Sequence, residues 1–434
     1  MLSPSTIKIM TDHTLKSLSE QYFPKYIVNY DNFTPQKDAI LYSGPYWDSK
    51  ELYAIINTVL NGNWIVSGEN VEKFQSEFST KFNVKHSHMV NSGSSANLVM
   101  ISALKKRFRW EDGDEIIVSP VGFPTTIAPL IQNKLKPVFV DIEFNTLNFD
   151  IGLIPDAITP KTKAIFVSPV LGNPPDLDLL KEICEKYNLV LIGDNCDSLG
   201  SKYNNRYIHE YYYSWSCSFY PAHHITTGEG GMVCSNDQHL IDLARSISWW
   251  GRDCYCVGTN NTLPCGTCGK RFDYWLENYD GIIDHKYIYG NVGYNLKPLD
   301  LQGAIGSAQL TKFDEISAKR KLHKTVIEDI LCSHVKIEKV TVLLNAEPCW
   351  FGVPVICEDR NQKEMLVDHL EYHKIQTRNY FGGNILLHPA YKNLDDYKKY
   401  PNANKTLDLV FFLGCAPSYN ERVLSYIEEV INKW

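Results

Sequence analysis

Two adjacent histidines, His223 and His224, lie in a glycine-rich stretch of the chain, SFYPAHHITTGEGGMV at residues 218–233. An unperturbed imidazole has a pKa of ~6.5, so it can take up and return a proton near neutral pH. Either histidine is therefore a candidate proton carrier.

Four cysteines lie close together in the segment GRDCYCVGTNNTLPCGTCGKRF, residues 251–272. They form the pairs Cys254-x-Cys256 and Cys265-x-x-Cys268, surrounded by glycine and asparagine. Closely spaced thiols in polar surroundings are typical of a metal site, and from the spacing alone a four-thiolate zinc site is one hypothesis. Most of the other cysteines lie in apolar runs, which is typical of buried packing residues.

Two further patterns indicate a site for an anionic ring compound. Gly93, Ser94 and Ser95 come at the start of an amphipathic helical pattern, where free N–H groups can bind an anion. The same residues are equally typical of a simple serine cap. Asp194 ends the apolar run NLVLIGD, at the edge of a sheet where ligands bind. Its carboxylate could hold a pyridine nitrogen protonated, or it could cap the next helix.

The sequence pattern around these residues predicts alternating strands and helices, which must position the site. Apolar runs of strand length at 136–142, 162–170 and 188–195 are separated by helical spacing at 176–187. This alternation predicts an α/β fold with a parallel or mixed sheet covered on both faces. We expect three parts: an N-terminal arm (1–50), a large domain (51–310) with a cysteine-rich insertion (251–290), and a small C-terminal domain (311–434).

Composition and charge exclude several classes of partner. The chain has 434 residues, 43 basic and 50 acidic side chains and a net charge of −7, so nothing favours a nucleic acid. No apolar run approaches the ~20 residues of a membrane helix, and we expect no membrane partner. The first residues lack the apolar core of a signal peptide, so we expect a cytoplasmic protein with reduced thiols.

Seven blocks in a fixed order resemble the DegT/DnrJ/EryC1/StrS sugar aminotransferase family, from about residue 50 to the end. They are SGSSA, GFPTT, PVFVDI, ITPKTKAI, GDNCD, SFYPAHHITTGEGG and GYNLKPLDLQGAIGSAQL. The resemblance implies a fold type I pyridoxal-phosphate enzyme, with a large mixed-sheet α/β domain and a smaller C-terminal α/β domain. It also implies a homodimer with shared sites.

The resemblance assigns cofactor-binding roles to seven residues. It implies that the cofactor phosphate is held by Gly93, Ser94, Ser95 and Ser218. Phe123 matches the aromatic residue that stacks on the cofactor ring, and Asp194 matches the partner of the ring nitrogen. Asn295 matches an asparagine that reaches the phosphate from the neighbouring subunit.

His223 stands where this family usually has the lysine that forms a Schiff base with the cofactor. Imidazole cannot form that bond, so the cofactor would arrive as pyridoxamine 5′-phosphate and bring its own amine. After the amine condenses with a sugar ketone, His223 could remove a proton from C4′ of the cofactor, and a β-hydroxyl would leave. The expected reaction is dehydration, with His223 as the proton carrier. We expect His224 to be structural and assign it no chemical role. A catalytically silent binding protein with a structural zinc site is the alternative from another class.

Two branches of the family resemble this loop in carrying a histidine. The GDP-4-keto-6-deoxymannose 3-dehydratase type needs no metal and renews its cofactor from glutamate. The CDP-4-dehydro-6-deoxyglucose 3-dehydratase type also carries a [2Fe–2S] cluster. In this chain 57 residues lie between Cys196 and Cys254, and Cys268 precedes GKRF, as in the second branch. The resemblance thus implies cluster ligands Cys196, Cys254, Cys256 and Cys268, with Cys265 as the substitute.

We therefore predict the cluster-dependent enzyme, with the metal-free type as its alternative. The expected substrate is a nucleotide-linked 4-keto-6-deoxyhexose carrying CDP, which loses its 3-hydroxyl. By resemblance, a separate NADH-dependent reductase with flavin and iron–sulfur groups supplies the electrons through the cluster. The product would be a precursor of 3,6-dideoxyhexoses in surface lipopolysaccharide, such as O-antigen.

Overall fold

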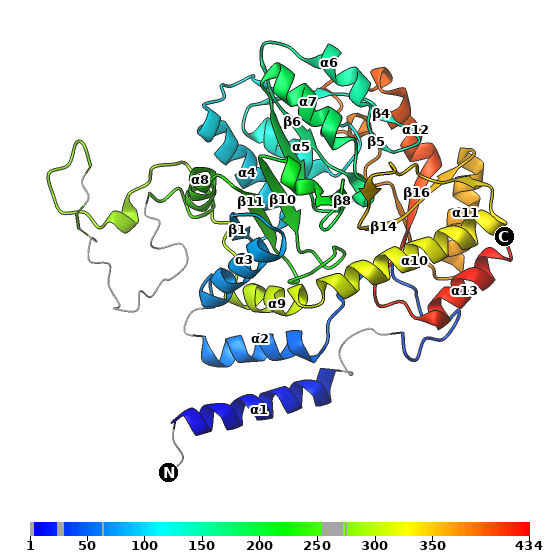
Figure 1. The fold of residues 1–434 in the computed structure, drawn as a ribbon, viewed down its shortest axis with the longest axis horizontal. Coiled ribbons are helices and arrows are strands. Elements are labelled where there is room, and N and C mark those ends of the chain that lie inside the picture. Colours follow the sequence, from blue (N-terminus) through cyan, green and yellow to red (C-terminus); the bar gives the residue numbers. More distant parts are fainter. Residues whose placement is uncertain (1–3, 24–29, 63–64, 254–271, 274–275) are drawn as a thin grey trace.

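A seven-stranded mixed sheet forms the centre of the computed structural model, which describes residues 4–23, 30–62, 65–253, 272–273 and 276–434 (Figure 1). The strand order is β1-β11-β10-β7-β6-β2-β3, in which β10, β7, β6, β2 and β3 run parallel and β11 is antiparallel to both neighbours. The strands are β1 (His86–Val90), β2 (Glu115–Val118), β3 (Lys136–Phe139), β6 (Thr162–Val167), β7 (Val190–Asp194), β10 (Ser214–Ser218) and β11 (Gly231–Ser235).

Residues along each central strand alternate between two hydrophobic cores. Ile116 and Val118 of β2 belong to one core, and Ile117 belongs to the other. Successive side chains of a strand point to opposite faces, so both faces of this sheet are buried. The continuous apolar runs are explained by this arrangement, because a strand with two buried faces needs no polar residues. The mixed sheet that the sequence predicts is therefore present.

Helices cover the large sheet on both faces. One core includes residues of α4 (Gly93–Phe108), α5 (Pro124–Gln132) and α8 (Gln238–Ser248), and the other includes residues of α3 (Glu69–Lys81) and α7 (Leu177–Tyr187). Short elements between them are β4 (Ile142–Glu143), β5 (Asn148–Phe149), α6 (Ile154–Ala157), β8 (Lys202–Tyr203) and β9 (Arg206–Tyr207).

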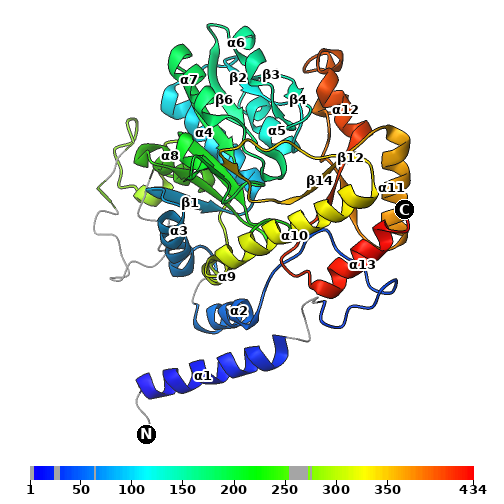
Figure 2. The same ribbon diagram turned by 45° about the vertical axis from the view of Figure 1, so that its right-hand side comes forward.

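A second, four-stranded antiparallel sheet lies toward the C-terminus (Figure 2). Its order is β12 (Ile337–Glu338), β14 (Gly352–Cys357), β16 (Val410–Gly414) and β15 (Thr377–Asn379). The accompanying helices are α10 (Phe313–His334), α11 (Arg360–Tyr372), α12 (Pro401–Leu409) and α13 (Glu421–Ile431), whereas β13 (Ala346–Glu347) pairs with β8 in a separate three-stranded sheet. This unit is the smaller α/β part that the sequence predicts. The boundary proposed at residue 310 falls between α9 (Asp300–Leu310) and α10 and remains a prediction.

The predicted N-terminal arm contains a helix, α1 (Pro4–Tyr22), which packs on α2 (Ser49–Asn61). Between them the chain reaches the small sheet, where Ile40 bridges Ile375, and this path brings Tyr42 to the ligand site described below. α2 begins with a capping box. The side chain of Asp48 accepts from the backbone N–H of Glu51, and the side chain of Glu51 accepts from the backbone N–H of Asp48. In the part of the chain that the structure describes, no helix has the length and apolarity to cross a bilayer.

Candidate active site

A cavity of about 440 Å³ opens at the carboxyl ends of β7 and β10, where an α/β sheet usually binds its ligand. Its walls come from the large sheet, the N-terminal segment and the loops of the small sheet. The lining residues are Tyr42, Ser92, Gly93, Ser94, Phe123, Thr125, Ser168, Asp194, Cys196, Asp197, Ser218, Tyr220, Ala222, His223, Glu229, Phe351 and Phe381. Most of the predicted site residues are thus brought together.

The phosphate end of the cavity is the N-terminus of α4. A Cβ atom on Gly93 would lie 2.4 Å from the Cβ of Ser218, so only glycine lets the helix start this close to β10. The Oγ of Ser94 donates to Thr125 Oγ1 at 3.1 Å. Free N–H groups and hydroxyls around a helix N-terminus fit a phosphate. Ser95 differs from the prediction in one respect: its N–H donates to the N-cap Ser92 Oγ at 3.1 Å, and it lies behind the lining.

Asp194 is the last residue of β7 and is fixed by three hydrogen bonds. Its Oδ2 accepts from Asn97 Nδ2 at 2.8 Å and from Thr126 Oγ1 at 2.7 Å, and its Oδ1 accepts from the Cys196 N–H at 3.1 Å. The chain then enters a turn, so Asp194 is not a helix cap. A carboxylate held this firmly at the cavity wall fits the protonated nitrogen of a pyridine ring.

Phe123 provides a ring platform at the same cavity. It stands at the N-cap of α5 and is 53% exposed, although Phe is usually buried. One edge contact, to Phe381 with ring centroids 6.2 Å apart, leaves much of the ring uncovered. The phosphate cradle, Asp194 and Phe123 together fit pyridoxamine or pyridoxal phosphate, and these are the residues that would hold it.

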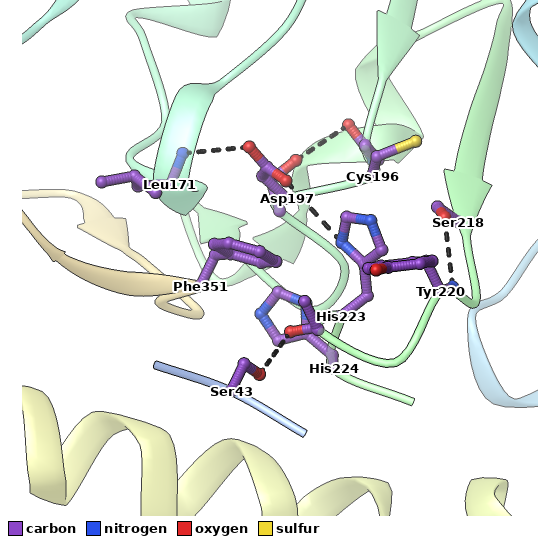
Figure 3. A network of polar contacts seen from close by, with 12 residues as sticks. Ser43, Leu171, Cys196, Asp197, Ser218, Tyr220, His223, His224 and Phe351 are labelled. Atoms are coloured by element: carbon purple, nitrogen blue, oxygen red, sulfur yellow. Dashed lines mark hydrogen bonds and ion pairs between the residues drawn. The ribbon is translucent and has the colours of Figure 1, made fainter. Parts of the chain in front are cut away.

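His223 faces this site from a tight turn in which its N–H donates to the Tyr220 carbonyl at 3.0 Å. Figure 3 shows that the rings of His223 and His224 leave the loop in different directions, and that the His223 ring points toward Asp197. The His223 Nδ1 lies 3.7 Å from Asp197 Oδ1 and has no hydrogen-bond partner. Burial first, and then the nearby Arg320 cation, lowers the pKa of His223 to about 3. The imidazole is therefore neutral in this structure.

The contact between His223 and Asp197 is not a salt bridge. Burial and the neighbouring Asp194 raise the pKa of Asp197 to about 7, and the imidazole opposite it is uncharged, so the two side chains do not carry opposite charges at neutral pH. His224 is buried on the other side of the loop, with its ring Nε2 2.9 Å from the Cys349 carbonyl oxygen. That contact agrees with the structural place expected for His224.

Arg320 of α10 lies behind the His223 loop and was missed by the sequence analysis. Its side chain is fully buried and donates to the carbonyl oxygens of Phe351 at 2.9 Å, Ala222 at 3.0 Å and His223 at 3.1 Å. Ser43 donates to the same Ala222 carbonyl at 2.8 Å. The segment AKRKLHK around Arg320 looks like a solvated helix face, so its sequence carries no signal for this contact.

Cys196 lines the cavity two residues after Asp194. Burial and the adjacent Asp194 raise the pKa of its thiol well above the usual range. The other predicted cluster ligands, Cys254, Cys256 and Cys268, lie outside the described residues, as does the substitute Cys265. Among the described residues no group of three His, Cys, Asp or Glu side chains could hold a metal. The four-cysteine cluster remains a prediction.

Comparison with known proteins gives the family. The model of the DegT/DnrJ/EryC1/StrS aminotransferase family matches residues 47–432. This chain belongs to that family. It is 38% identical, over 90% of its length and 85% of the relative's, to the dTDP-4-dehydro-2,6-dideoxy-D-glucose 3-dehydratase of Saccharopolyspora spinosa. It is 37% identical, over 89% of both chains, to the lipopolysaccharide biosynthesis protein RfbH of Salmonella typhimurium.

Solved structures confirm the fold predicted for this member of the family. One is a GDP-4-keto-6-deoxymannose-3-dehydratase with a trapped PLP–glutamate geminal diamine. It superposes with a TM-score of 0.78 at 29% identity, covering 90% of this chain and 99% of that one. The large mixed sheet and the smaller C-terminal sheet therefore form the fold type I arrangement that the sequence motifs indicated.

One predicted member of the family site, Asn295, lies outside the lining of this cavity. It is exposed and bridges Trp249 beyond the end of α8. A residue that serves the site of a second subunit would be placed outside its own, so this position agrees with the prediction without testing it.

Several lining residues of this family member carried no sequence signal. They are Tyr42, Tyr220, Glu229, Phe351 and Phe381. Tyr42, Phe351 and Phe381 come from segments far from the motifs. In the sequence, an aromatic residue in an apolar run is indistinguishable from a buried core residue. Tyr220 and Glu229 lie inside the quoted loop, but no chemical pattern distinguished them there.

Proposed function

We propose that this protein removes the 3-hydroxyl group of a nucleotide-linked 4-keto-6-deoxyhexose, with pyridoxamine 5′-phosphate as cofactor and His223 as the proton carrier. The observation that carries the proposal is the place of His223 in a cavity that also presents a phosphate cradle and the Asp194 carboxylate. No lysine is found among the described lining residues. Relatives named as sugar 3-dehydratases support the same reaction.

The chain's own residues perform binding, orientation and proton transfer. Gly93, Ser94 and Ser218 hold the phosphate, Asp194 orients the ring through its nitrogen, and Phe123 covers one ring face. His223 takes a proton from C4′ of the cofactor and can return it. When bound, the cofactor supplies the amine that attaches to the sugar and the conjugated ring that accepts electrons.

Removal of the hydroxyl also requires two electrons, and two sources fit different observations. We favour glutamate, which renews the cofactor amine without a metal, because a related 3-dehydratase has been solved with a PLP–glutamate adduct. The second candidate is a [2Fe–2S] cluster fed by a separate reductase. It is favoured by Cys196, whose thiol stands at the cavity beside Asp194.

The nucleotide is a finer point of the proposal. CDP is implied only by the sequence resemblance, whereas the named relatives act on dTDP- and GDP-linked sugars. A panel of CDP-, dTDP- and GDP-linked 4-keto-6-deoxyhexoses, each incubated with protein and pyridoxamine phosphate, tests the reaction. We expect a 3-deoxy product from at least one sugar, and amination at C4 without loss of the hydroxyl would contradict the proposal.

The same incubations separate the two electron sources. With glutamate as donor, turnover should continue in iron-free protein. Without glutamate it should stop once the supplied pyridoxamine phosphate is consumed. With the cluster, anaerobically purified protein should contain iron and acid-labile sulfide, and turnover should require a reductase. Glutamate-independent turnover that needs iron would therefore replace our favoured source by the second.

A further inference from the structure

The charges of the cavity leave a nucleotide substrate without an evident counter-ion. Three carboxylates line it, those of Asp194, Asp197 and Glu229, and the described lining includes no lysine or arginine. The N-terminus of α4 serves the cofactor phosphate in the proposed function. A sugar nucleotide brings a second anionic group, its diphosphate, which needs a cation of its own.

Arg378 stands on the face of the small sheet that meets the cavity. It belongs to β15 and pairs with Phe412 of β16, and directly opposed residues of antiparallel strands project to the same face. The Phe412 ring packs on Phe381 at 5.6 Å and on Phe351 at 6.0 Å, and both of these rings line the cavity.

The guanidinium of Arg378 is stacked on another lining residue. Its Cζ lies 4.2 Å from the ring centroid of Tyr42, which comes from the N-terminal segment. Stacking on an aromatic ring fixes the plane of a guanidinium and leaves its N–H edge free. A cation held in one orientation loses less entropy when it binds an anion.

Arg378 has no carboxylate partner among the described residues, so its charge is available to an anionic ligand. It is exposed, and its Nη1 donates to the carbonyl oxygen of Thr377 at 2.7 Å. Its guanidinium also interacts with the Tyr42 side chain, and no carboxylate of the described residues lies within ion-pair distance. Arg360, on the neighbouring helix α11, offers a contrast, because its Nη2 pairs with Asp408 at 2.7 Å. The unpaired guanidinium therefore keeps most of its donors for a ligand.

We propose that Arg378, stacked on Tyr42, binds the diphosphate of the nucleotide sugar at the mouth of the cavity. The inference rests on the proposed function and adds a substrate-binding residue that the family motifs do not contain. The planar fork of N–H groups matches two phosphate oxygens, which a lysine at this position would contact as a point charge.

Binding of nucleoside diphosphates tests the inference without turnover. Protein loaded with pyridoxamine phosphate is titrated calorimetrically with CDP, dTDP, GDP and UDP. For the nucleotide that binds wild type best, R378Q should weaken binding by about tenfold or more, the range expected for a hydrogen bond to a charged group. R378K should fall between R378Q and wild type, and the matched control R360Q should bind like wild type.

The outcomes separate this inference from the proposed function. Equal affinity in R378Q and wild type would overturn the role of Arg378 and leave the dehydration untouched. A wild-type protein that binds none of the four nucleotides, and dehydrates none of the sugars, would overturn the proposed function itself. Cofactor absorbance should be unchanged in R378Q, because the side chain is exposed and is not one of the residues that hold the cofactor. The thermal midpoint should fall only slightly, through loss of the contact with Tyr42.

Discussion

At the scale of single residues, the site is defined by what surrounds His223. Burial and Arg320 lower the pKa of the imidazole and keep it neutral, and Nδ1 has no hydrogen-bond partner among the described residues. The loop carrying it is fixed from behind, because Arg320 donates to the carbonyls of Ala222, His223 and Phe351. Its place at the cavity therefore depends on a residue of another helix.

Replacing Arg320 should consequently impair proton transfer more than cofactor binding. R320M removes the Arg320 donors from the carbonyls of Phe351 and His223, whereas the Ala222 carbonyl keeps its bond from Ser43. Each buried group left unsatisfied costs about 1–3 kcal/mol, so the free energy of unfolding should also fall. We expect turnover to drop at least about tenfold, with an unchanged dissociation constant for pyridoxamine phosphate. R320K, which keeps the charge, should recover part of the rate.

The control for this change is R360M, an exposed arginine of the small sheet's helix α11. It should alter the free energy of unfolding by less than about 0.5 kcal/mol and leave turnover as in wild type. If R320M lost stability but kept the wild-type rate constant in its folded fraction, Arg320 would be purely structural.

At the scale of elements, the start of α4 decides whether the cofactor phosphate can bind. The helix begins beside β10 because Gly93 has no Cβ, which would lie 2.4 Å from Ser218 Cβ. This closeness aligns the free N–H groups of the first turn with the serine hydroxyls of the cradle. The start of α4 could be predicted from the sequence, because a glycine and serines followed by apolar residues at helical spacing are typical of a helix N-terminus.

G93A should therefore displace α4 from β10 and weaken cofactor binding. We expect the dissociation constant of pyridoxamine phosphate to rise by about tenfold or more, as overpacking of this size costs about 1–3 kcal/mol. G44A is the matched control, because an added Cβ there meets nothing within 4 Å. Equal cofactor affinity in G93A and G44A, measured by equilibrium dialysis, would remove the phosphate cradle from this position.

At the scale of the whole molecule, the sequence predicted the features that depend on neighbouring residues. It did not predict the contacts between segments that are far apart in the chain. Strands β6 and β7, the start of α4, and the positions of Asp194 and His223 all follow from short patterns. Tyr42, Arg320 and Phe351 join the site only because the N-terminal segment, α10 and the residue before β14 pack around the His223 loop. No local pattern encodes such contacts, since any buried aromatic or helical arginine would look the same.

The predicted sharing of sites between two subunits can be tested by complementation. H223N and N295A proteins should each be inactive, but a mixture refolded or co-expressed should recover about a quarter of wild-type activity. Half of the dimers are then mixed, and each of those contains one site with both an intact His223 and the partner's intact asparagine. Activity that stays at the level of the separate variants would place Asn295 in its own subunit or outside the site.

The central claim is that His223 moves the proton at C4′ of the cofactor. The most direct measurement is loss of deuterium from C4′-labelled pyridoxamine phosphate, followed by mass spectrometry in the presence of a sugar nucleotide that the protein dehydrates. Wild type should release the label, and H223N should release it at least about a hundredfold more slowly while binding the cofactor equally well. Release at the wild-type rate from H223N would contradict the account.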